Sequence, residues 1–190
     1  MAIPQRITPK KLADYLEILT RAVFQAGLSW ALIESKWDDF RQAFHDFDPR
    51  RVASLTPAEI AWLAEESSIV RSRKKIEATV ENAKTMLALD HEYHGFANYL
   101  HSFKDYDALR SDIRKRFKYV GDLSVYYFLF RAGEPVPPYA EWAKTVAGVH
   151  PRIREMVALG GDVTAQATLN STRRTARERP HSPARSRRDR

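Results

Sequence analysis

A short turn followed by a tryptophan holds the first residues of this sequence that could do chemistry. Gln25-Ala26-Gly27-Leu28-Ser29 separates two segments whose apolar residues recur at helical spacing, and Trp30 follows directly. Gly27 allows backbone conformations that other residues resist, and Ser29 is a good N-cap for the next helix. Trp30 would then lie in that helix's first turn. Such a turn can carry a binding site, and it is also a common corner between two packed helices.

A group of cations is the second feature with chemical meaning. Four of them lie at the start of a segment whose apolar positions continue at helical spacing to Leu89: Arg71, Arg73, Lys74 and Lys75. Positive charge near a helix start opposes the helix dipole. An anionic partner would explain that cost, and a solvated basic surface would explain it as well.

A glycine hairpin is the third feature. Lys118-Tyr119-Val120-Gly121 lies between a basic helix end and a mostly apolar segment that runs to Phe130. Helix, hairpin, helix is an outline whose backbone amides can hold a phosphate at the start of the second helix. We therefore treat Lys118 and Gly121 as candidate phosphate contacts.

The charge of the chain is unevenly distributed. The net charge is +7, and residues 171–190 contribute +6 of it through eight Arg against two acids. This tail is rich in Arg, Ser and Pro, which predicts disorder. It would add salt-dependent affinity for any polyanion, or it could be an extension without a function. We predict one helical domain at 1–160 and a disordered Arg-rich tail at 161–190.

Several protein classes are excluded by composition. There is no Cys, which removes disulfides, thiolate catalysis and cysteine-ligated metals. The six His form no recognisable ligand motif, so we expect no metal and no cofactor. No apolar run approaches the roughly 18 residues of a membrane span, and no signal peptide is visible. We expect a soluble cytoplasmic protein.

The elements that must position these residues all read as helices. Thr8-Pro9 predicts the start of a first helix, and Thr56-Pro57-Ala58-Glu59 is a capping box that starts another. Between them, aromatic and aliphatic residues recur at helical spacing until Phe47-Asp48-Pro49 ends the segment. The position of Gly133 after the apolar segment predicts a C′ residue that ends the helix. The prolines at 135, 137 and 138 predict an extended segment. No β-strand alternation is present, so the fold class is all-α.

At this point the sequence resembles the DNA-3-methyladenine glycosylase I family of the helix-hairpin-helix glycosylases. The resemblance covers roughly residues 12–133 and rests on ordered blocks: 25–30, 47–49, Ile69-Val70-Arg71 with Arg73 and Lys75-Ile76, Asn82-Ala83, and Phe117-Lys118-Tyr119-Val120-Gly121. It implies an all-α helix-hairpin-helix fold and a repair enzyme that extrudes an alkylated adenine and cleaves its glycosidic bond. It also implies that the loop matching Gln25–Ser29 probes the gap left by the base, while Trp30 stacks on the base.

The sequence departs from this family in three places. The family's pocket carboxylate falls on Ala22, the zinc-binding Cys and His have no counterpart, and the segment after Gly133 is different. Replacing the carboxylate with Ala22 should relax or abolish the discrimination of adenine. Candidate replacement acids are Glu34, Glu17 and Glu141, each of which could also be an ordinary surface acid. The candidates for the aromatic wall are Tyr15, Tyr126, Tyr127 and Tyr139. For the first three, ordinary core packing is the favoured interpretation.

The sequence therefore predicts a monomeric, monofunctional glycosylase of damaged double-stranded DNA. Trp30, Ala22 and Tyr139 are assigned to the base, and the loop residues Gln25, Gly27, Leu28 and Ser29 to DNA. Further DNA contacts are assigned to Arg71, Arg73, Lys75, Lys118 and Gly121. The alternative is a protein that binds damaged DNA on the same fold and has lost the enzymatic activity.

Overall fold

A computed structural model describes residues 6–145 of the chain, and the regular secondary structure of this part is all helical. It forms two compact units, a body up to Pro137 and a second unit that begins at Pro138. The all-α prediction is confirmed, whereas the predicted boundary at residue 160 and the tail at 161–190 lie outside the described residues. The elements of the body are α1 (Leu12–Gln25), α2 (Trp30–Ser35), α3 (Trp37–Ala43), the 3-10 turn η1 (His45–Phe47), α4 (Pro49–Ala53), α5 (Pro57–Glu65), α6 (Arg73–Glu92), α7 (Phe96–His101), α8 (Tyr106–Arg116) and α9 (Asp122–Arg131).

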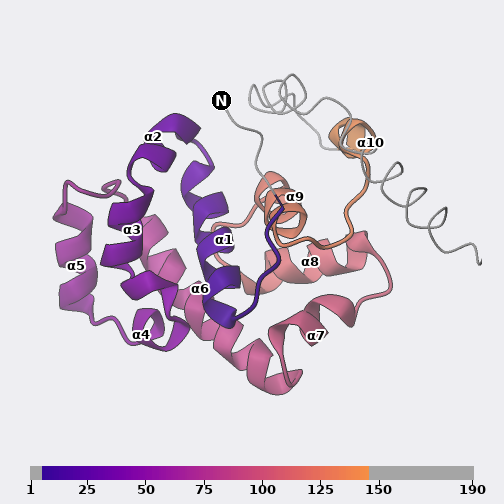
Figure 1. Ribbon diagram of the computed structural model, residues 1–190, viewed down its shortest axis with the longest axis horizontal. Coiled ribbons are helices and arrows are strands. Elements are labelled where there is room, and N and C mark those ends of the chain that lie inside the picture. Colours follow the sequence, from indigo (N-terminus) through magenta and orange to yellow (C-terminus); the bar gives the residue numbers. More distant parts are fainter. Residues whose placement is uncertain (1–5, 146–190) are drawn as a thin grey trace, which may run out of the picture. The chain divides into compact units, whose positions relative to one another are not determined.

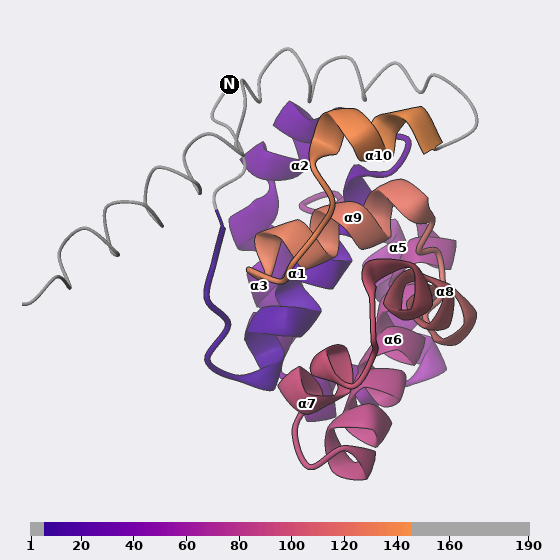
Figure 2. The same ribbon diagram turned by 90° about the vertical axis from the view of Figure 1, so that its right-hand side faces the viewer.

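Two helices form the centre of the body. α1 packs against α2, α4, α6 and α9, while α6 packs against α1, α4, α5 and α7 (Figure 1). In the second view α9 lies along α1, and α8 precedes α9 in the chain and packs against it (Figure 2). Because α2, α4, α5, α7 and α9 each pack on α1 or α6, these two helices set the positions of the loops between them.

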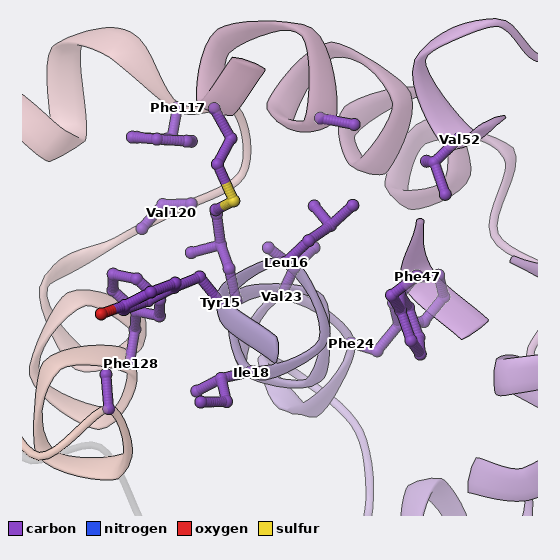
Figure 3. Close-up of a cluster of buried hydrophobic side chains, with 14 of the residues drawn as sticks. Tyr15, Leu16, Ile18, Val23, Phe24, Phe47, Val52, Phe117, Val120 and Phe128 are labelled. Atoms are coloured by element: carbon purple, nitrogen blue, oxygen red, sulfur yellow. The ribbon is translucent and has the colours of Figure 1, made fainter. Parts of the chain in front are cut away.

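The core surrounds α1 and contains its predicted apolar stripe. Leu16, Leu19 and Val23 are completely buried. Figure 3 shows side chains of α1 meeting Phe117, Val120 and Phe128 on one side. Phe24 of α1 meets Phe47 and Val52 on the other side. Burying a large apolar side chain contributes about 1.5–3 kcal/mol, so this cluster is the main source of the body's stability.

The start of the first helix differs from the prediction. α1 begins at Leu12 and not at Pro9. The carboxylate of Asp14 accepts hydrogen bonds from the backbone N–H groups of Lys10 and Lys11, at 2.7 and 3.1 Å. These bonds satisfy amide groups that a helix start leaves without partners, so the chain turns into the helix at Lys11.

The aromatic segment that we predicted as one helix is divided into α2, α3 and η1. Lys36 leaves the helical conformation between α2 and α3, and its Nζ donates to the carbonyls of Ser67 and Ser68. The backbone then passes through positive φ from His45 to Phe47. The spacing still predicted the core correctly, since Trp37, Phe40, Phe44 and Phe47 are buried and stacked on one another.

The remaining helix signals are confirmed, apart from one boundary. Thr56 and Glu59 form the predicted capping box of α5, and Gly133 follows α9 with φ +83°. α6 begins at Arg73, so Arg71 lies in the loop before the helix and not on it. Among residues 6–145, the structure contains no helix with both the length and the apolar character that a membrane span requires.

Of the second unit, the structure describes residues 138–145. Residues 134–138 form no helix, and α10 (Tyr139–Thr145) follows. Tyr139 and Trp142 lie on this helix with their ring centroids 5.7 Å apart.

Candidate nucleic-acid interface

The turn after α1 adopts the conformation that its glycine predicted. Gly27 has φ +83°, a left-handed conformation that L-residues rarely adopt. Ser29 occupies the N-cap position of α2, but its side chain makes no cap hydrogen bond; its backbone carbonyl accepts from Ile33 N–H at 3.1 Å. Gly27 and Ser29 are exposed, while Leu28 is half-buried against the core. The turn therefore presents mostly backbone to solvent.

Trp30 is half-buried and packs on one of the tyrosines that the sequence offers for the aromatic wall. Its ring lies 5.2 Å from that of Tyr127 on α9, at an interplanar angle of 66°. Burial raises the pKa of the Tyr127 phenol, and the positive charges of Arg131 and Arg21 oppose that shift. Tyr127 thus remains a neutral hydroxyl at ordinary pH, with a guanidinium donating to it from Arg131 at 3.3 Å.

Gln25 lies inside the protein and not on the surface of the loop. Its side chain is 5% exposed and hydrogen-bonds to Tyr127. A direct contact between Gln25 and DNA would require this side chain to leave its position. In the structure, Gln25 instead lies beside Tyr127, the aromatic partner of Trp30.

Ala22 lies on the same face of α1 as Gln25 and is buried. Its carbonyl accepts hydrogen bonds from the Ala26 amide at 3.2 Å and, from α9, the Ser124 hydroxyl at 3.5 Å. The α1 face with Ala22 and Gln25 therefore packs on the α9 face with Ser124 and Tyr127. At Ala22 this face offers a methyl group where the resemblance implies a carboxylate.

Glu34 is bound by a buried arginine. Its two carboxylate oxygens accept from Nη1 of Arg21 at 2.9 and 2.8 Å. Arg21 is 9% exposed, and its guanidinium lies 4.1 Å above the ring of Trp37. Burial lowers the pKa of Arg21, and the charge of Glu34 opposes that shift. The pair ties α2 to α1 and so fixes the helix that begins with Trp30.

Glu17 also serves the packing of helices. It accepts from Nε1 of Trp37 at 2.8 Å and from Nη2 of Arg41 at 2.8 Å, which binds α3 to α1. Glu141 and Tyr139 lie on α10, outside the body that carries Trp30. Burial raises the pKa of Tyr139 to about 12. The assignments of these acids and of Tyr139 to the site stay predictions.

The hairpin before α9 is built without a strained glycine. Tyr119 takes the positive φ, +58°, and is about half exposed, whereas Gly121 has an ordinary φ of −86° at the N-cap of α9. A Cβ placed on Gly121 would meet no atom of the described residues within 4 Å. The backbone of Lys118 is held from α6: its N–H donates to Oδ1 of Asn82 at 2.6 Å, and its carbonyl accepts from Nδ2 at 3.1 Å.

The cations near the start of α6 have different surroundings. Nζ of Lys75 donates to the carbonyls of Phe24 and Ala26, at 3.2 and 2.5 Å, so it lies under the turn after α1. Arg73 is exposed and pairs with Glu77 at 2.9 Å, and Arg71 is exposed in the preceding loop. Arg71 and Arg73 thus remain accessible to an anion, while Lys75 supports the turn.

Sequence reasoning named Tyr127 only as one of four tyrosines for an aromatic wall, and it missed the structural role of Asn82. One signal was available, because Lys75, Thr79 and Asn82 are polar residues at positions i, i+4 and i+7 on a helix otherwise identified by its apolar stripe. Polar residues on a buried face are informative, since they need partners. Within the described part of the chain, no three His, Asp or Glu side chains come together in a group that could hold a metal ion.

The geometry and the comparisons with known proteins agree. The body has the fold of the helical 3-methyladenine DNA glycosylases: a crystal structure of 3-methyladenine DNA glycosylase I superposes with a TM-score of 0.59 at 28% identity, over 67% of this chain and 81% of that one. The enzyme from Staphylococcus aureus, solved for its recognition of 3-methyladenine, gives 0.60 at 28% identity, over 70% and 80%. The chain belongs to the methyladenine glycosylase family, whose model matches residues 9–120. The resemblance seen in the sequence is therefore confirmed.

Two characterised relatives support the same family. DNA-3-methyladenine glycosylase 1 of Escherichia coli is 31% identical and matches over 57% of this chain and 70% of its own length. The DNA-3-methyladenine glycosylase of Haemophilus influenzae is 37% identical over 89 residues, which are 47% of this chain and 48% of that protein. The chain thus spans about half the length of the Haemophilus relative in this match.

Proposed function

We propose that this protein is a DNA base-excision glycosylase that hydrolyses the N-glycosidic bond of an alkylated purine, such as 3-methyladenine, after flipping it out of the duplex. Support comes from the family, from relatives named DNA-3-methyladenine glycosylase, and from the site around Trp30. Its partner is damaged double-stranded DNA, on which we expect it to act as a monomer in the cytoplasm.

The observation that carries the proposal is the placement of Trp30. The indole begins α2 directly after the turn at Gly27, and it is half-buried with Tyr127 behind it. Tyr127 packs against one part of the half-buried indole, and another part stays accessible to a planar ligand. An N3-methylated adenine in DNA is cationic, and stacking it on an indole gives a cation–π contribution of about 0.5–2 kcal/mol. Base and aromatic partner therefore match in shape and in charge.

The chemistry needs only modest help from the protein. The positive charge of an N3-alkylated purine weakens its bond to the sugar, and flipping a damaged base costs a few kcal/mol, less than for a paired one. Hydrolysis would be monofunctional, because the residues directly after the hairpin are Asp122 and Leu123 and include no lysine for a Schiff base. With Ala22 in place of a carboxylate, we expect relaxed discrimination of adenine from other purines.

The remaining assigned residues would hold the DNA backbone. Lys118 and Gly121 are exposed at the start of α9, where backbone amides and the helix dipole favour a phosphate. Arg71 and Arg73 would add sequence-independent contacts. Gly27, Leu28 and Ser29 form the turn that would enter the gap left by the flipped base.

A second candidate function is binding of damaged DNA without base removal. Two observations favour it: Ala22 is not ionisable, and both oxygens of Glu34 are bound to Arg21. In this alternative the site would recognise a flipped base and leave its glycosidic bond intact.

One pair of measurements separates the two functions. Purified protein is incubated with duplexes that carry 3-methyladenine or 7-methylguanine, and with an undamaged duplex of the same sequence. Binding and the release of free base are followed in the same samples. We expect tighter binding to the damaged duplex and release of 3-methyladenine. Tight lesion binding without release of either base would establish the binding protein and refute the enzyme.

A further inference from the structure

Helix α6 carries a row of polar residues on a buried face. Lys75, Thr79 and Asn82 recur at i, i+4 and i+7, which places them along one side of a helix. Thr79 is fully buried and its hydroxyl donates to the Lys75 carbonyl at 2.9 Å, while Asn82 is 1% exposed. Burying such groups is unfavourable unless each is hydrogen-bonded. The two end residues, Lys75 and Asn82, bind the turn after α1 and the hairpin before α9, which are the two loops of the proposed interface.

At one end of the row, Lys75 completes the end of α1. The last carbonyls of an α-helix have no partner within the helix, and the last turn of α1 has no basic residue of its own. Nζ of Lys75 supplies the missing donors to the carbonyls of Phe24 and Ala26. A cation at this place also interacts favourably with the helix dipole. Lys75 therefore fixes the backbone from which the turn at Gly27 departs.

At the other end, Asn82 fixes the hairpin. Its amide makes two reciprocal hydrogen bonds with the backbone of Lys118, as a neighbouring strand would. The next residue, Tyr119, has the positive φ that reverses the chain. An amide side chain with both a donor and an acceptor is needed for this pair of bonds. Asn82 thus holds the hairpin where its conformation is least favourable for an ordinary residue.

The two contacts are joined by a rigid element. Lys75 and Asn82 are seven residues apart, which is about two helical turns and about 10 Å along the axis at 1.5 Å per residue. The α6 backbone between them is continuously helical. The separation between the turn and the hairpin is therefore set by two turns of one helix.

We propose that Lys75 and Asn82 are positioning residues that hold the turn and the hairpin at a fixed separation, so that a duplex bound at the hairpin presents its damaged base to the turn. This proposal rests on the proposed function, and it assigns Lys75 an indirect role in place of the DNA contact expected from the sequence. Neither side chain needs to touch the nucleic acid.

The test compares two variants by a measurement on each loop. Lys75→Met should accelerate amide hydrogen exchange at least tenfold at residues 26–29 and leave 118–121 unchanged; Asn82→Ala should do the reverse. Lys75→Met should lower the ratio of affinities for damaged and undamaged duplex at least fivefold. Its affinity for the undamaged duplex should stay within twofold of the wild-type value. Asn82→Ala should weaken binding to both duplexes at least fivefold. Changed exchange at both loops in each variant, or at neither, would overturn the proposal.

Matched controls separate positioning from charge and from folding. Lys84→Met removes an exposed lysine of the same helix, and Asn98→Ala removes an asparagine that bonds the carbonyls of Tyr93 and His94 at another turn. Both should leave the exchange at the two loops and the affinity ratio unchanged, and the same changes in either control would refute the assignment. Lys75→Gln and Asn82→Ser provide smaller changes if the first variants fail to fold. A wild-type protein that does not distinguish damaged DNA would refute the proposed function, while hydrogen exchange would still decide whether these residues position the loops.

Discussion

The turn at Gly27 and the hairpin at Lys118 face the same proposed ligand, but they are built by different means. The turn contains a glycine in the left-handed region and is held by charge, through Lys75 below it and Arg21 with Glu34 beside it. The hairpin places Tyr119 in the left-handed region and is held by the neutral amide of Asn82. The turn leads into an aromatic ring, whereas the hairpin leads into the N-terminus of a helix.

This difference matches the two tasks of a glycosylase. Contacts to phosphates position a protein on DNA without reading sequence, and a flipped base is selected in its own site. A hairpin that offers backbone amides serves the first task for any duplex. An aromatic ring with a neutral tyrosine behind it serves the second. Changes at the turn should therefore affect selectivity for damage, and changes at the hairpin should affect all DNA binding.

The largest effect is expected from removing the base-stacking ring. Trp30→Ala should reduce release of 3-methyladenine by about ten- to a hundredfold, since stacking of a base on an aromatic ring is worth about 1–3 kcal/mol. Salt-sensitive binding to undamaged DNA should remain, because it depends on the hairpin. Single-turnover release and binding at two salt concentrations measure both quantities. Undiminished base release would show that Trp30 is not the stacking residue.

The sequence predicted this comparison only in part. Gly27, Trp30 and the hairpin could be located because turns and helix starts leave local signals, and the order of the blocks revealed the family. The contacts that hold the loops could not be found in this way. Lys75 and Asn82 act on residues 49 and 36 positions away, and no local pattern specifies such a pairing. Lys75 was assigned to DNA because a cation at a helix start looks the same whether its partner is a phosphate or a carbonyl.

A smaller effect is expected from the acid beside the turn. Glu34→Gln should change base release only a few-fold, because both oxygens of Glu34 are bound to Arg21 and its role is to hold α2. The side chain of Glu34 is 62% exposed, so solvent screening limits the loss of stability to below about 1 kcal/mol. A general acid or base contributes about a hundredfold or more. A loss of that size in single-turnover release would identify Glu34 as the catalytic carboxylate and refute the structural role.

The most direct test of the difference between the loops comes from their glycines. Gly27→Ala should destabilise the protein by about 1 kcal/mol or more, because alanine resists φ +83° although space for its methyl group is available. Gly121→Ala should leave stability unchanged or slightly higher, since its φ of −86° is ordinary. Thermal unfolding measures both.

Binding measurements on the same variant then test why residue 121 is a glycine. Within residues 6–145, no atom lies within 4 Å of a Cβ placed on Gly121, so we would attribute a loss of affinity in Gly121→Ala to a ligand that approaches the backbone there. We expect weaker binding to damaged and undamaged duplexes alike, with the ratio between them unchanged. An altered ratio would mean that the hairpin takes part in reading the base, and the division of tasks between the two loops would then be wrong.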